Sequence, residues 1–215
     1  MYNGMEEAPP NMAISMLYNY AIMAPNEKVY PIFEKYLQKF GTSKNEHERA
    51  AATYILGYVA DPDACLDHVR DNIENLTNFI IERMQDESYV VREAAGECVG
   101  RFSEHVTSDF LDYHKKIMPC LLRVVKDLAS SKHDMTVQKT LYALNEFVLN
   151  LDYDIKLYLD EIIHILLAYV AAPQFSRDVK YWALVCMTST IATADKKIIP
   201  YMQLLLESFH AIITN

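Results

Sequence analysis

Apolar residues recur at helical spacing along nearly the whole chain. Five of them fall at i, i+4, i+7, i+11 and i+15, which places them on one face of a helix: Val69, Ile73, Leu76, Ile80 and Met84. The polar residues 86–88 then end this stripe and supply residue types that cap helices. A second stripe of apolar and small residues runs from Val91 to Phe102. The pattern predicts two amphipathic helices joined by a short polar turn.

This helix pair recurs about every 44 residues. Arg49, Ala52 and Gly57 each have the same residue type 43 positions later, at Arg92, Ala95 and Gly100. Two further ladders follow the same period: Phe102, Phe147 and Ile191 in one, and Tyr113, Tyr158 and Tyr201 in the other. Helix pairs with a period of roughly 40–47 residues are typical of HEAT or armadillo arrays.

The predicted fold is therefore all-α, a right-handed α-α superhelix (solenoid) of HEAT repeats. With the outer helix of each pair called A and the inner helix B, the expected helices are B 10–23, A 28–40, B 45–60, A 67–85, B 89–105, A 112–129, B 135–150, A 156–171, B 177–193 and A 198–213. Four full repeats then cover 28–60, 67–105, 112–150 and 156–193, with half repeats at 10–23 and 198–213. The terminal helices are apolar, whereas solenoid ends usually carry polar caps, so we expect residues 1–215 to be one array cut from a longer one.

Composition and charge narrow the class of partner. The chain has 215 residues, of which 51% are hydrophobic and only five are glycine, as suits a folded helical protein. Its formal charge of −9 disfavours direct nucleic-acid binding, which needs a cationic surface, and favours a basic protein partner. The four cysteines form no CxxC pair, and three of them lie in apolar periodic stretches, where we expect buried thiols in a reducing compartment. No leader peptide and no membrane span is expected.

No catalytic or cofactor motif stands out. Nucleotide-binding glycine loops, GxSxG and HExxH are missing from the sequence, so neither an enzyme nor a cofactor is expected. The chain has a single His-Glu pair, His47-Glu48, whereas deoxyhypusine hydroxylase, a HEAT-like metalloenzyme, needs several such pairs for its chemistry. One pair is too few ligands, and no metal site is predicted.

Candidate binding residues lie on the B helices, whose surface is usually the concave, partner-binding side of such arrays. Opposite the buried stripe of helix 89–105 stand Glu93, Glu97, Gly100 and Glu104. The repeat offset of 45 residues carries the position of Gly100 to Asn145. Two successive offsets, 45 and 44 residues, carry the position of Glu93 to Trp182, the only tryptophan. Carboxylates would pair with Lys or Arg, the amide would fix a peptide backbone, and the indole would stack on a side-chain stem. The alternatives are a solvated face for the glutamates and a core position for the tryptophan.

Several stretches together resemble the importin-beta (karyopherin-beta) superfamily, and most of all its importin-four and importin-five branch. They are VVREAAGECVGRFSEHV, YHKKIMPCLLRVV, KTLYALNEFVLNL and IATADKKIIPYMQLLL. The resemblance covers nearly all of residues 12–213 in one register. It implies a nuclear transport receptor that shuttles between cytoplasm and nucleus and carries basic cargo of the ribosomal-protein or histone type. It further implies contacts with Phe-Gly nucleoporins and control by Ran-GTP, with the main Ran contacts outside this chain.

Two rival interpretations remain open from the residues alone. One is another HEAT adaptor, such as a phosphatase regulatory scaffold, although repeats in that class are shorter and more uniform than 43–46 residues. The other is a HEAT-like enzyme, either the hydroxylase or a DNA glycosylase. The glycosylase would need a basic concave face, which a charge of −9 disfavours.

Overall fold

A computed structural model describes residues 12–13, 16, 19–20, 22–23, 26–60, 65–130 and 132–214. The regular elements in these ranges are all helices. The first pair is α2 (Asn26–Phe40) and α3 (Glu46–Val59), and the second is α4 (Leu66–Asp71) and α5 (Ile73–Met84) with α6 (Tyr89–His105). The third pair is α7 (Thr107–Leu111) and α8 (His114–Asp127) with α9 (Asp134–Leu149), and the fourth is α10 (Leu159–Ala171) with α11 (Arg177–Ala194). The last helix is α12 (Met202–Thr214). Of the half repeat predicted at 10–23, residues 10–11, 14–15, 17–18 and 21 lie outside the described residues.

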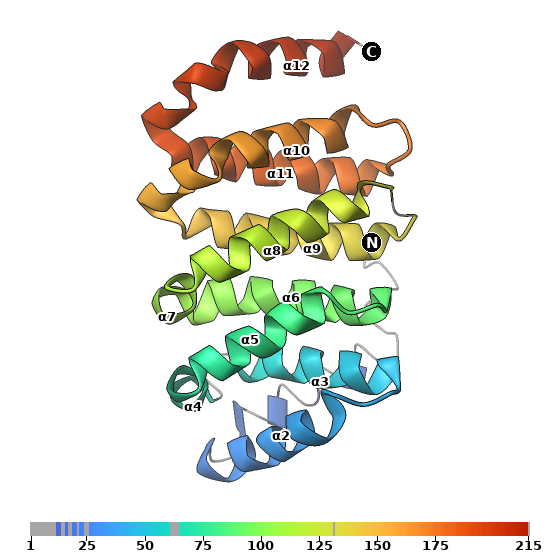
Figure 1. The fold of residues 1–215 in the computed structure, drawn as a ribbon, viewed down its shortest axis with the longest axis vertical. Coiled ribbons are helices and arrows are strands. Elements are labelled where there is room, and N and C mark those ends of the chain that lie inside the picture. Colours follow the sequence, from blue (N-terminus) through green and yellow to red (C-terminus); the bar gives the residue numbers. More distant parts are fainter. Residues whose placement is uncertain are drawn as a thin grey trace.

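The pairs stack along one long axis, from α2 at one end to α12 at the other (Figure 1). The B helices α3, α6, α9 and α11 begin at residues 46, 89, 134 and 177, so the period is 43 to 45 residues. Each B helix packs on the A helix of its own pair, and the contacts of α3 with α6, α6 with α9 and α9 with α11 join successive B helices. The all-α HEAT solenoid predicted from the sequence is therefore confirmed.

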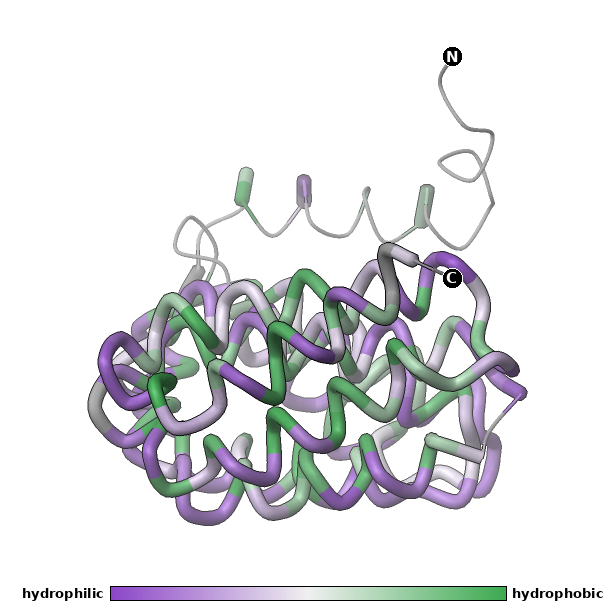
Figure 2. Tube along the Cα trace, turned by 90° about the horizontal axis from the view of Figure 1, so that it is seen from above, coloured by the Kyte–Doolittle hydropathy of each residue, from purple (hydrophilic) through white to green (hydrophobic). Residues whose placement is uncertain are grey.

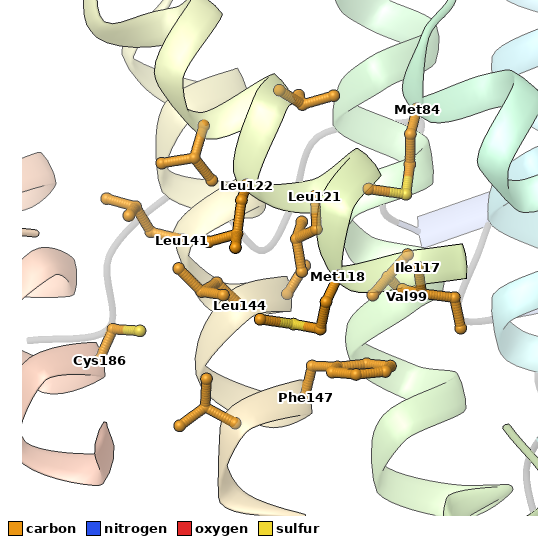
Figure 3. Packing of buried hydrophobic residues seen from close by; sticks show 14 of the residues in the cluster. Met84, Val99, Ile117, Met118, Leu121, Leu122, Leu141, Leu144, Phe147 and Cys186 are labelled. Atoms are coloured by element: carbon orange, nitrogen blue, oxygen red, sulfur yellow. The ribbon is translucent and has the colours of Figure 1, made fainter. Parts of the chain in front are cut away.

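The core is continuous from repeat to repeat. Apolar side chains of α8 point between α6 and α9, and they include Met118, Leu121 and Leu122 (Figure 3). Phe102 of α6 meets Phe110 of α7 edge-on at 5.2 Å between ring centroids, and Phe110 meets Phe147 of α9 at 5.8 Å. Seen along the stack, hydrophobic and hydrophilic segments alternate along each helix, as amphipathic helices require (Figure 2).

The outer layer differs in detail from the prediction. The single helix expected at 67–85 is broken at Asn72, which separates α4 from α5. The helix expected at 112–129 is preceded by the short helix α7. The segment Asp152–Leu157 is a 3-10 helix and overlaps the start of the α-helix expected from 156. The segment Asp195–Tyr201 is also a 3-10 helix and overlaps the start of the α-helix expected from 198. Asp152 and Asp195 start these segments with positive φ angles of 44° and 48°, a strained backbone for residues other than glycine.

Glycine allows α6 to approach α9 closely. A Cβ atom on Gly96 would lie 2.9 Å from the backbone carbonyl carbon and oxygen of Lys139, and one on Gly100 would collide with the ring of Tyr142. Backbone atoms cannot move aside as a flexible side chain can. These two positions therefore fix the spacing of the central B helices.

An ion pair joins the first two repeats. The guanidinium group of Arg49 on α3 donates from Nε to Asp86 Oδ2 at 2.9 Å and from Nη2 to Oδ1 at 2.8 Å. Arg49 Nη1 also donates to the Ser43 carbonyl at 2.8 Å, and the backbone N–H of Ser88 donates to Asp86 at 3.0 Å. Only 10% of the Arg49 side chain and 8% of the Asp86 side chain are exposed. The pair therefore ties α3 to the turn between α5 and α6.

Candidate binding face on the B helices

The surface formed by α3, α6, α9 and α11 on the side away from the A helices is called the B-helix face here. It contains a groove of about 580 Å³ that crosses α3, α6 and α9. Tyr54 and Tyr58 of α3 line one part of it, and at this end it also reaches Tyr36 of the A helix α2, Ala13 and further small and apolar side chains. Glu93 and Glu97 of α6 and Lys139 of α9 supply its charged groups. The groove thus combines aromatic walls with carboxylates.

Glu97 lies at the centre of a charged network. Its Oε1 accepts from Arg101 Nε at 3.1 Å, one helical turn along α6, and its Oε2 accepts from Lys139 Nζ of α9 at 2.6 Å. The guanidinium carbon of Arg101 lies 3.7 Å from the centroid of the Tyr58 ring, a cation–π contact that crosses to α3. Glu97 therefore links three successive B helices.

Glu93 is held from the neighbouring repeat. The hydroxyl group of Tyr54 donates to Glu93 Oε1 at 3.2 Å. Burial is the largest cause of a strongly raised pKa for Tyr54, and the charge of Glu93 adds to it. Tyr54 therefore stays a neutral donor, and Glu93 is half-buried and lines the groove.

A second cavity of about 300 Å³ continues the groove toward α11. Tyr142 of α9 and Trp182 of α11 form its aromatic wall, with ring centroids 5.7 Å apart in an edge-to-face arrangement. Glu97, Met135 and Lys139 line both cavities. Trp182 is half-buried, so its ring is part packing element and part cavity wall.

A separate acidic group lies farther along the same helices. Asn145 Nδ2 donates to Glu146 Oε1 at 2.8 Å, and Asn145 is only 5% exposed. Its Oδ1 has no hydrogen-bond partner among the described residues. Burial raises the pKa of Glu146, and the nearby charge of Glu104 adds to this, although the bond from Asn145 works in the other direction. Glu104 itself is exposed.

The five residues predicted from the sequence therefore fall into two groups. Glu93, Glu97 and Trp182 border the connected cavities, whereas Glu104 and Asn145 belong to the second cluster. The expectation of an open face opposite the buried stripe is wrong for Glu97, which is 8% exposed, and for Asn145. The reason is that each B helix also packs against its B neighbours, so much of that face is an interface between repeats.

Sequence reasoning missed the tyrosines of the groove and the two cations. Tyr54 lies 43 residues before Glu97, so the repeat offset carried backward by one unit would have found it. Arg101 follows Glu97 by four residues on the same helix, a spacing that brings side chains together and is visible in the sequence. No comparable signal marks Lys139, because its pairing with Glu97 depends on the distance between α6 and α9. Among the described residues, no group of three or more His, Cys, Asp and Glu side chains could hold a metal ion. Within the same ranges, no helix is both long and apolar enough to cross a membrane.

Such a face is suited to binding an extended cationic segment. Carboxylates can pair with ammonium or guanidinium groups, and tyrosine and tryptophan rings can pack along their aliphatic stems.

Comparison with known proteins gives a consistent result. Residues 12–151, more than half of the chain, match the family model described as "IPO5-like, TPR repeats". The helix-pair period of 43 to 45 residues nevertheless exceeds the 34 residues of a tetratricopeptide repeat and fits HEAT repeats. Importin-4 of Homo sapiens is 29% identical over 125 residues, and Importin-4 of Mus musculus is 28% identical over 125 residues. These segments cover 58% of this chain and 11% of each relative.

Solved structures of Kap121p share the fold. Kap121p alone superposes on the whole chain with a TM-score of 0.87 at 22% identity, covering 20% of the Kap121p chain. Kap121p bound to RanGTP gives 0.81 at 22% identity, over 97% of this chain and 20% of the other. Kap121p bound to Pho4p superposes with a TM-score of 0.85 at 23% identity, over 95% of this chain and 20% of the Kap121p chain. The chain therefore spans about a fifth of the solved relatives and about a tenth of the curated ones.

Proposed function

Because the chain belongs to the importin-beta family, we propose that it is a segment of a nuclear transport receptor whose B-helix face binds a Lys- and Arg-rich part of a cargo protein. The observation that carries this proposal is the groove of about 580 Å³, in which the carboxylates of Glu93 and Glu97 stand beside aromatic walls. The formal charge of −9 favours the approach of a basic partner. Cargo of the ribosomal-protein or histone type has the required charge.

Regulation and localisation are proposed for the whole receptor. Solved structures show Kap121p bound to RanGTP, to Nup53p and to Pho4p. By analogy, the receptor that contains this segment releases cargo under control of Ran-GTP, contacts Phe-Gly nucleoporins, and shuttles between cytoplasm and nucleus. Binding energy on the B-helix face is spread over several successive repeats.

A titration of the 215-residue chain with a fluorescent Lys/Arg-rich nuclear-localisation peptide tests the proposal. Dissociation constants are measured from about 50 to 300 mM salt, with a scrambled peptide of equal charge as the control. We expect preference for the ordered sequence and affinity that falls with salt, because paired surface charges are screened. Equal affinity for both peptides, or binding of neither, would refute cargo recognition on this segment.

Two variants then locate the site. Glu93→Gln combined with Glu104→Gln removes two negative charges from the B-helix face. The double change should weaken binding of the unscrambled nuclear-localisation peptide by about five- to tenfold, as expected for loss of two partly exposed ion pairs. Glu74→Gln with Glu82→Gln removes two equally charged but exposed carboxylates from α5 in the A layer. The proposal requires that this control pair leaves the affinity within twofold of the unchanged chain.

A further inference from the structure

The two cavities of the B-helix face share three lining side chains, and one of them is a lysine. Lys139 extends from α9 and borders both the 580 Å³ groove and the 300 Å³ cavity, as do Glu97 and Met135. Its ammonium group lies 2.6 Å from Glu97 Oε2, and its side chain is 32% exposed. A lysine ammonium therefore already occupies the most buried carboxylate of the proposed binding face.

We propose that Lys139 is an internal stand-in for a lysine of the partner: cargo binding displaces its ammonium from Glu97, and the two cavities then form one continuous groove from α3 to α11. This inference rests on the proposed function, because it concerns how the same face accepts its cargo. Its chemistry is an exchange of one ammonium group for another at a single carboxylate.

The surroundings of Glu97 are suited to such an exchange. Arg101 holds the other carboxylate oxygen at 3.1 Å and is itself placed over the Tyr58 ring, so Glu97 stays oriented when Lys139 leaves. The lysine stem is flexible and a third of the side chain is exposed, so its ammonium can rotate into solvent and recover its hydration.

Charge balance supports the exchange as well. Around the groove, Arg101 and Lys139 both bind Glu97, and Glu93 accepts from the neutral Tyr54 hydroxyl, so two carboxylates stand with two cations. Adding a partner lysine while Lys139 stays in place would leave an excess cation in a half-buried site. Displacing Lys139 keeps two carboxylates matched with two cations, which favours exchange over addition.

The internal lysine also makes the site selective. Every ligand must compete with a tethered group, so the observed affinity equals the intrinsic affinity multiplied by the fraction of molecules in which the site is free. A neutral side chain cannot replace the ammonium at Glu97, and neither can an acetylated lysine. The ion pair thus discriminates against weakly charged segments that would otherwise bind the aromatic walls.

Amine labelling tests the displacement directly. The 215-residue chain is treated with limiting acetylating reagent, with and without saturating lysine-containing peptide, and acetylation at each lysine is measured by mass spectrometry. Bound ligands usually protect lysines, but we expect labelling of Lys139 to increase at least twofold when peptide binds. Lys126, which pairs with Glu161 in the A layer, serves as the control and should not change. Unchanged or reduced labelling of Lys139 in the bound state would overturn the inference.

A substitution gives an independent measurement. Lys139→Met keeps the length of the side-chain stem and removes the ammonium group. It should tighten the binding of a lysine-containing peptide by about two- to fivefold, the range expected for loss of a partly exposed ion pair. A peptide with acetyl-lysine in place of lysine should bind Lys139→Met no more tightly than the unchanged chain. Lys126→Met should bind both peptides with the affinity of the unchanged chain. If the unchanged chain binds but Lys139→Met does not bind more tightly, the stand-in role is refuted and the proposed function remains. If neither protein binds the peptide, both fail.

Discussion

The ion pair between Arg49 and Asp86 offers a quantitative test of how the repeats are held together. Asp86→Ala removes two charge-assisted hydrogen bonds to Arg49 and the acceptor for the Ser88 N–H. It also leaves the Arg49 guanidinium largely buried without its anion. Loss of one partner from a buried pair costs about 3–5 kcal/mol. Arg49 retains its bond to the Ser43 carbonyl, so we expect a loss near the lower end, about 3 kcal/mol.

The double variant Arg49→Met with Asp86→Leu separates charge from packing. It removes both charges and keeps apolar volume at the contact, and buried pairs replaced in this way are often close to neutral in stability. The double variant should therefore lose about 1 kcal/mol or less, although it changes more atoms than the single one.

Equilibrium urea unfolding, followed by circular dichroism at the helix band and by Trp182 fluorescence, measures both variants. A loss below about 0.5 kcal/mol for Asp86→Ala, typical of surface pairs, would show that the pair contributes little. A double variant as unstable as the single one would refute the reasoning, because the loss would then come from the missing contacts and not from an unpaired charge.

Three further predictions follow from the backbone and from titration. Gly96→Ala should destabilise the fold by about 1 kcal/mol in urea unfolding, because overpacking against the Lys139 backbone outweighs the better helix propensity of alanine; greater stability than the parent would contradict this. Asp195→Gly should raise stability by about 1 kcal/mol, since glycine accepts its φ of 48° without strain, and a lower melting temperature would show that the side chain matters more. Burial works to raise the pKa of Asp86, but bonds from Arg49 and Ser88 and the nearby cations outweigh it and lower the pKa. Its stabilisation should therefore be complete above the unfolded value of about 3.9 and be lost as pH falls through the lower folded value, a pH dependence that Asp86→Ala should lack.

Much of the fold follows from the sequence because each helix carries a clear apolar stripe. The 43- to 45-residue ladders through Phe102 and Phe147 predicted the repeats, and both rings are fully buried between successive repeats. The break at Asn72 and the 3-10 turns beginning at Asp152 and Asp195 were missed. Their apolar spacing is compatible with a continuous helix, and only the packing of the outer layer decides the local backbone.

The candidate site was less predictable for a related reason. A periodic pattern assigns one buried face to each helix, but α6 is covered by an A helix and by two B neighbours. Glu97 therefore appears polar and exposed in the sequence but is buried in a network that reaches Arg101 and Lys139. The two glycines on α6, Gly96 and Gly100, were the available sign that another helix lies close to that face.

The dense packing between B helices also determines how the array can deform. The contacts of α3 with α6, α6 with α9 and α9 with α11 are more extensive than those between successive A helices. In a bent beam, the stiffest layer keeps its length while softer layers stretch or compress. The B helices are this layer of constant length here, and bending occurs by opening or closing the A side. A ligand on the B-helix face would therefore find nearly constant spacing between binding residues, whereas clefts between A helices would widen and narrow with curvature.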